Sequence, residues 1–251
     1  MLYKLVERIC ADIDRLDLGL FGGLAEPIQE AAPDTIAFIR DSRKRGKKLT
    51  YDEVAKTQAL VAFTFIKSIP RTARAMVDKV KDRRVHAARR CAVASVLAYL
   101  VQPHDIIPDD APGYYGYLDD AILLHAGLVE YLDTLPAGSN ADSQARMVNY
   151  LIALTPEHVR PALQLAVSSM SQVVQILSMM GPEIAEGTLA QIVANPLQAS
   201  STVAAPPGFS PRAARDYGGG HWSGGNYFEG NNVIMGGGGP ALIDGQLFIP
   251  G

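Results

Sequence analysis

The amino-acid sequence predicts an all-α fold, a helical bundle followed by an irregular glycine-rich C-terminal arm. Apolar residues recur at three- and four-residue steps through most of the first 195 positions, which is typical of helices with one buried face. No alternating apolar run long enough for a sheet occurs before residue 200. The chain has 251 residues, of which 48% are hydrophobic and 20% are charged, as in ordinary globular proteins.

Helix signals follow one another through the first half of the chain. The apolar stripe within residues 2–16 predicts an amphipathic helix. Pro33 suits the first turn of another helix, where a missing N–H is tolerated. Thr50 and Glu53 form a capping box ahead of a long apolar stretch. We expect Pro70 to kink or end the helix that starts there.

The second half of the body continues the helical pattern. Further helices are predicted at about 84–101, 119–135, 141–154, 157–180 and 183–194. Residues 161–182 carry no charge, and 22 positions are enough to cross a bilayer. The polar members of this segment fall on one stripe, namely Gln164, Ser168, Ser171, Gln175 and Ser178. This pattern favours a helix buried between other helices or at a subunit interface; an interfacial membrane helix and a true span are the alternatives.

Composition divides the chain into a helical domain at 1–195, a Ser/Ala/Pro-rich linker at 196–216 and a tail at 217–251. The tail has 12 glycines and no Lys or Arg, so it cannot build a packed core of its own. One interpretation is a disordered tail. The other is an arm that docks on a protein partner or on a second copy through its aromatic residues, Trp222, Tyr227, Phe228 and Phe248. Asp244-Gly245 predicts a short hairpin near the end.

Positive charge is concentrated in the first half, since residues 40–90 contain 16 basic and 5 acidic residues. The densest candidates for anion binding are Arg40, Arg43, Lys44, Arg45, Lys47 and Lys48. Such clusters attract anionic lipid or nucleic acid, although few aromatic residues lie nearby to stack on bases. The alternative is a solvated surface that faces water or the acidic second half. Two cysteines and no secretory signal predict a cytoplasmic protein, either free or peripheral at the membrane.

Residues 99–120 hold the densest chemistry, because three prolines and two glycines are interleaved with acidic side chains between two apolar helices. We expect the chain to reverse here. In one hypothesis, Asp119 or Asp120 caps the following helix. In the other, a divalent cation such as Mg or Mn is bound by ligands from the set His104, Asp105, Asp109, Asp119 and Asp120.

This stretch resembles a known family. The segment reads Tyr99-Leu100-x-x-Pro103-x-Asp105-x-Ile107-Pro108-Asp109-x-x-Pro112, followed by Gly116-Tyr117-Leu118-Asp119-Asp120. It is similar to the YkvA-like family, DUF1232, over about residues 85–130, with one residue more than usual between Pro112 and Gly116. The resemblance implies a short helical hairpin with a Pro/Gly/Asp-rich corner, in a family often predicted to be membrane-associated. It implies no reaction and no substrate.

Three functions are consistent with these features. The first is a non-enzymatic interaction or scaffold module that binds a protein or self-associates through its arm. The second is a divalent-metal-binding regulator or metal-dependent hydrolase centred on the acidic corner. The third is a peripheral membrane protein that binds anionic lipid through residues 40–90. No catalytic residue and no small-molecule substrate can be identified, since nucleophile motifs are missing and Cys91 lies on an apolar helix face.

Overall fold

The computed structural model describes residues 1–42, 49–102, 106–107, 114–131 and 141–198, together with the backbone of 241–243 and 246–248. The helices are α1 (Leu2–Asp14), the 3-10 helix η1 (Leu18–Leu24), α2 (Ala25–Ala31), α3 (Pro33–Ser42), α4 (Tyr51–Lys81), α5 (Ala87–Tyr99), α6 (Tyr117–Tyr131), α7 (Ala141–Ala153), α8 (Arg160–Met179) and α9 (Pro182–Ala194). The predicted all-α bundle is therefore confirmed. Two short strands, β1 (Ala241–Ile243) and β2 (Gln246–Phe248), pair antiparallel where a hairpin was predicted.

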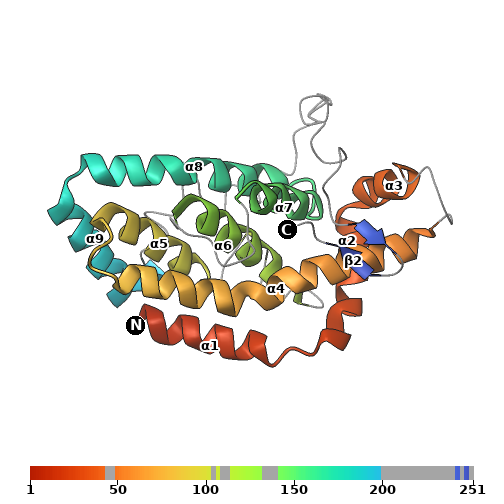
Figure 1. Ribbon diagram of the computed structural model, residues 1–251, viewed down its shortest axis with the longest axis horizontal. Helices are drawn as coiled ribbons and strands as arrows, with labels where there is room; N and C mark the ends of the chain where they lie inside the picture. The colour runs from red at the N-terminus through yellow and green to blue at the C-terminus, as the bar shows by residue number, and fades with distance from the viewer. Residues whose placement is uncertain are drawn as a thin grey trace.

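Helices α5 and α6 occupy the middle of the bundle (Figure 1). Helix α4 packs on one side of them and is covered in turn by α1, while α7 and α8 pack on the other side. Helix α9 crosses one end of the molecule beside α5, and α2 and α3 lie near the other end of α4. The two middle helices are buried almost all round, as their nearly continuous apolar sequences require.

Helix α4 begins as the sequence indicates. The Glu53 carboxylate accepts the Thr50 N–H at 2.7 Å, and Thr50 Oγ1 accepts the Glu53 N–H at 3.2 Å. This capping box is therefore confirmed. The expectation that Pro70 could end the helix is wrong, because α4 continues for 31 residues with Pro70 inside it. Tertiary packing on both sides explains why one lost backbone hydrogen bond is tolerated.

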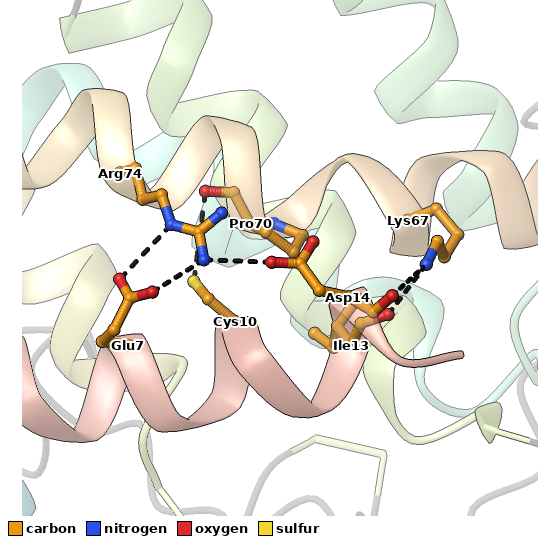
Figure 2. Close-up of polar contacts among 7 residues, drawn as sticks. All are labelled: Glu7, Cys10, Ile13, Asp14, Lys67, Pro70 and Arg74. Carbon is orange, nitrogen blue, oxygen red and sulfur yellow. Dashed lines mark hydrogen bonds and ion pairs between the residues drawn. The ribbon is translucent and has the colours of Figure 1, made fainter. Parts of the chain in front are cut away.

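Contacts between α1 and α4 hold Pro70 and its neighbours in place (Figure 2). Lys67 Nζ donates to three carbonyl groups at the end of α1, those of Ile13, Asp14 and Leu16, at 2.9–3.0 Å. The Ile13 carbonyl also accepts the Leu16 N–H at 3.1 Å. The ammonium group therefore adds a donor at the end of α1, where carbonyl groups lack full helical partners, and it opposes the negative end of the helix dipole. One turn beyond Pro70, the Arg74 guanidinium binds Glu7 at 2.7 Å and Asp14 at 3.0 Å.

A second set of contacts joins α4, α5 and α9. Arg90 in the first turn of α5 donates from Nε to the Val80 carbonyl at 2.8 Å, near the end of α4. Its Nη1 binds the Glu186 carboxylate of α9 at 2.7 Å. One guanidinium therefore fixes the α4–α5 turn against α9. The α4–α5 and α8–α9 turns lie at the same end of the bundle (Figure 1).

Helices α4, α5 and α6 approach one another closely at Gly127. A Cβ atom added to Gly127 would lie 3.1 Å from Met76 Cε and 3.2 Å from Val96 Cγ2. Contacts this short are tighter than ordinary van der Waals contacts, so the glycine allows α6 to sit deep between the other two helices. This close packing seats the second half of α6 against α4 and α5.

Candidate functional site

The described part of the acidic corner is built around the side chain of Asp119, in the first turn of α6. Its Oδ2 accepts the Tyr99 hydroxyl at 2.6 Å and the Ile107 N–H at 3.0 Å. The Tyr99 oxygen in turn accepts the Ile106 N–H at 2.9 Å. Asp119 is fully buried, as is nearly all of Asp120. The carboxylate therefore ties the end of α5 and the chain at 106–107 to α6.

Burial dominates the protonation of Asp119. Loss of solvation raises the pKa of its carboxyl to about 7, although the Tyr99 hydroxyl and backbone N–H groups of Ile107 and the first turn of α6 oppose the shift. Its Oδ1 makes no hydrogen bond of good geometry to the described residues. A carboxyl of this kind holds its proton to higher pH than a surface aspartate. The capping hypothesis stays a prediction: Asp119 lies inside α6, and its carboxylate accepts hydrogen bonds from Tyr99 and Ile107.

The metal hypothesis remains a prediction. Asp119 and Asp120 lie side by side and buried in α6, whereas His104, Asp105 and Asp109 lie outside the described residues. Within the residues that the structure describes, no group of three His, Cys, Asp or Glu side chains could hold a metal ion.

A second buried polar cluster was not foreseen from the sequence. The His125 ring of α6 lies with Nε2 at 2.7 Å from Ser68 Oγ of α4 and with Nδ1 at 3.0 Å from Gln144 Oε1 of α7. The ring also meets Phe65 edge-on at 4.8 Å between centroids. Serine, histidine and an orienting amide have the order of a hydrolytic triad. Separations of 57 and 19 residues leave no local spacing that could reveal it.

The hydrogen-bond directions argue against an activated nucleophile. Ser68 Oγ lies 2.6 Å from the Phe65 carbonyl oxygen, which can only accept, so the hydroxyl proton points there. His125 Nε2 must then donate to Ser68 and cannot take the serine proton. Burial lowers the pKa of His125 to about 4, so the ring is neutral at pH 7. The oxygen and nitrogen of the Gln144 side-chain amide have nearly the same shape and can exchange places. With the nitrogen facing His125, the amide N–H donates to Nδ1 and completes the cluster.

The outer helices contrast with this interior. Only three residues of α8, Leu163, Met170 and Leu177, are buried, at seven-residue intervals. The predicted polar stripe is exposed along its whole length, so the expectation that this helix is buried between others is wrong. Large apolar side chains are exposed where α8 turns into α9: Ile176 (54%), Met179 (86%), Met180 (46%) and Ile184 (50%). We call these four residues the α8–α9 corner.

Helix α8 is long and apolar enough to cross a membrane by length and composition, with a mean hydropathy of 1.2 over its window and 17% of that window buried. One such helix is weak evidence for a span. Its Leu163, Met170 and Leu177 seam packs on α5 and α6, and the Tyr131 hydroxyl of α6 donates to its Met170 carbonyl at 2.9 Å.

The described basic residues of 40–90 are spread along α4 and beyond both of its ends. Arg40 lies near the end of α3 and binds Asp41 at 2.8 Å. Helix α4, about 45 Å long at 1.5 Å per residue, then separates this site from the α4–α5 turn. Arg43, Lys44, Arg45, Lys47 and Lys48 lie outside the described residues. The α4–α5 turn, at the same end of the bundle as the α8–α9 corner, carries further described positive charge. We call its members the basic turn: Lys79, Lys81, Arg83, Arg84 and Arg89.

One segment of the chain, at the centre of the fold, matches a known family. Residues 89–126, which run from α5 into α6, match the family model described as "Protein of unknown function (DUF1232)". The chain contains a DUF1232 segment. The resemblance inferred from the Pro/Gly/Asp corner is thus confirmed. The described residues of the segment form the centre of the bundle, where Asp119 and His125 are buried and Tyr99 is half-buried. No curated protein and no solved structure shows a significant match to the chain.

The DUF1232 segment therefore contributes buried packing, whereas the exposed corner and basic turn lie mostly outside it. The predicted docking residues Trp222, Tyr227 and Phe228 lie outside the described residues, and only the backbone of Phe248 is described, in β2. Cys91 is buried in α5, and burial raises the pKa of its thiol to about 11, in line with a packing role.

Proposed function

We propose that this protein is a non-enzymatic module that docks peripherally on an anionic membrane surface, using the end of the bundle where the α4–α5 and α8–α9 turns meet. The observation that supports this most directly is the exposure of four large apolar side chains at the end of the bundle that also carries the basic turn. Soluble proteins seldom leave such groups together in water without a partner. The mixture of apolar and cationic groups suits the boundary between acyl chains and anionic headgroups.

Rough magnitudes indicate that both components are needed. A fully buried Leu, Ile or Met side chain contributes about 1.5–3 kcal/mol, and partial insertion of Met179, Met180 and Ile184 contributes less. A Lys or Arg close to an anionic surface contributes about 1 kcal/mol. Neither term alone holds a protein firmly on a vesicle, whereas their sum supports reversible binding.

Docking at the surface fits α8 better than insertion across the bilayer. Five exposed uncharged polar residues follow its length, and each would lose its water in the hydrocarbon core. The buried seam of α8 would also have to leave the bundle. Contact at the end of the helix requires neither change.

Vesicle flotation tests the proposal with the full chain. We expect binding to vesicles of phosphatidylcholine with phosphatidylserine, loss of binding at high salt, and weak binding to phosphatidylcholine alone. Met179→Asp should reduce binding strongly. Leu165→Asp, at a residue 47% exposed near the other end of α8, is the matched control and should leave it nearly unchanged.

Two results would contradict this proposal. If the full chain does not float with anionic vesicles, membrane docking is wrong, and the corner is better assigned to a protein partner. If Leu165→Asp and Met179→Asp reduce binding equally, α8 lies flat on the membrane, and contact at the end of the bundle is wrong.

A second candidate function, divalent-metal binding at the acidic corner, draws support from one observation. Asp119 Oδ1 is buried without a hydrogen bond of good geometry among the described residues, next to the buried Asp120. Magnesium or manganese would supply a partner for such an oxygen. If metal binds there, the melting temperature should rise with either ion and fall with EDTA. An unchanged melting temperature would remove this candidate.

A further inference from the structure

We infer that the pocket between the end of α4 and the start of α5 binds a phosphate monoester group, and that this group is the headgroup of the lipid on which the protein docks; the second part rests on the proposed function. The open pocket has a volume of about 510 Å³ and is lined by Lys79, Asp82, Arg84, Val85, His86 and Arg89. Ligand pockets in proteins typically measure about 300–1,000 Å³. The space therefore suits a phosphate group with part of the molecule that carries it.

The charges around the pocket favour an anion. Among the described residues that line the pocket, Lys79, Arg84 and Arg89 are cations from α4, the turn and α5, and Asp82 is a carboxylate. Ammonium and guanidinium groups from separate elements can surround the oxygens of one phosphate.

The contact between Arg84 and Asp82 indicates which anion the pocket prefers. Arg84 Nε and Nη2 bind the two Asp82 carboxylate oxygens, each at 2.9 Å. This fork is the geometry in which a guanidinium also binds phosphate. The Arg84 side chain is 90% exposed, so a ligand can reach it and compete with Asp82 for the guanidinium. A ligand must replace Asp82 at this guanidinium, and a doubly charged monoester does so better than a singly charged diester, because the three cations attract it more strongly.

The start of α5 adds donors on the same side. His86 Nδ1 accepts the Ala88 N–H at 3.3 Å, so the proton of a neutral ring lies on Nε2, which can donate. The positive end of the α5 dipole acts in the same direction. Both would strengthen the binding of an anion that the cationic side chains already attract.

The position of the pocket connects it with the membrane. Arg90, which follows Arg89, binds Glu186 in α9, two residues beyond Ile184 of the α8–α9 corner. A lipid whose headgroup occupies the pocket would therefore have its acyl chains beside exposed apolar side chains. A nucleic acid would gain nothing from those side chains.

The test compares vesicles of phosphatidylcholine containing phosphatidate, a phosphate monoester, with vesicles containing phosphatidylserine, a diester, at equal surface potential. We expect the full chain to prefer phosphatidate by about tenfold, as one additional charge-assisted contact would give. Arg89→Gln and Lys79→Gln should each abolish this preference. Arg83→Gln removes the same charge from the same turn at a residue outside the pocket lining, and should keep it. Asp82→Asn removes the carboxylate that competes for Arg84 and should increase binding to both lipids.

Glycerol 3-phosphate, tested by its effect on the melting temperature, separates the two proposals. If it stabilises the protein and Arg89→Gln removes the effect, while no vesicle binds, the phosphate pocket stands and membrane docking is wrong. If anionic vesicles bind without preference, or if Arg83→Gln and Arg89→Gln behave alike, docking stands and the pocket is wrong. If neither probe binds, both proposals are wrong.

Discussion

The DUF1232 segment and the pair of outer helices place their polar and apolar residues in opposite ways. In α5 and α6, charged and hydrogen-bonding groups such as Asp119 and His125 are buried, and each has specific partners. At the α8–α9 corner, apolar side chains such as Met179 face solvent. Buried polar groups with partners specify how helices pack, and exposed apolar groups favour binding. The part of the chain with a recognisable family is thus the scaffold, and the proposed contact surface lies beside it.

The largest effect should come from breaking the interior. Asp119→Ala leaves the Tyr99 hydroxyl and the Ile107 N–H buried without their acceptor. Each unsatisfied group costs about 1–3 kcal/mol, so we expect a loss of about 4 kcal/mol in the free energy of unfolding, measured by urea denaturation. Asp119→Asn keeps an acceptor oxygen and should cost clearly less. Equal losses in the two variants would show that the hydrogen bonds are not the reason.

The next largest effect is the change in the free energy of unfolding with pH, to which the buried His125 contributes. The pKa of His125 is lowered to about 4 in the folded protein, against about 6.5 when unfolded, so the unfolded chain binds an extra proton between these values. Its contribution to stability is thus complete above about pH 6.5 and is lost as the pH falls toward 4. The difference in stability between the parent and His125→Gln should grow by roughly 2–3 kcal/mol from pH 4 to 6.5.

Asp119 supplies the control for this dependence of stability on pH, because its pKa is shifted in the opposite direction from that of His125. Its pKa is raised to about 7, so the folded protein holds a proton that the unfolded chain releases near pH 4. Its contribution is present at low pH and is lost as the pH rises toward 7. Asp119→Asn should remove this loss and leave the His125 profile. If the free energy of unfolding of the unmodified protein and of His125→Gln changes with pH in the same way, the His125 ring is not buried in its neutral form.

A smaller effect is expected at the junction of α1 and α4. Lys67→Met keeps the aliphatic stem but removes the donor to three carbonyl groups at the end of α1. Because water can reach part of this site, we expect a loss of only about 1–2 kcal/mol in urea denaturation. Lys56→Met, at an exposed lysine of the same helix paired with Asp52, is the control and should cost under about 0.5 kcal/mol.

The smallest effect on stability should come from the outer corner. Met179 is 86% exposed, so Met179→Asp removes almost no packing and should change the free energy of unfolding by less than about 0.5 kcal/mol. Met170→Asp on the buried seam of the same helix should be strongly destabilising. If Met179→Asp destabilises the fold to a similar degree, the corner is a packing surface and not a binding surface.

Local patterns predicted most of the fold, because the signals they use act over a few residues. The Thr50 capping box, the first-turn Pro33 and the apolar stripe of α1 all depend on neighbours along one helix. Pro70 was misjudged because its tolerance depends on α1, some 60 residues away. The outward position of the α8 polar stripe was missed for a similar reason, since spacing defines a face without saying what covers it.

The candidate sites were less predictable for the same physical cause. Spacing drew attention to Asp119, but its bond to Tyr99 became evident only with α5 and α6 side by side. His125, Ser68 and Gln144 come from three helices, and no sequence interval connects them. The basic residues of 40–90 are close together in the sequence, whereas the described ones are spread along α4, from Arg40 before it to Arg89 after it.

Arg90 has a consequence for how this end of the molecule moves. Its guanidinium holds the Val80 carbonyl and the Glu186 carboxylate at the same time, so opening either turn breaks a contact of the other. Amide hydrogens on both sides should then exchange with solvent in one cooperative opening event. A surface joined in this way meets its ligand already ordered, and little conformational entropy is lost on contact.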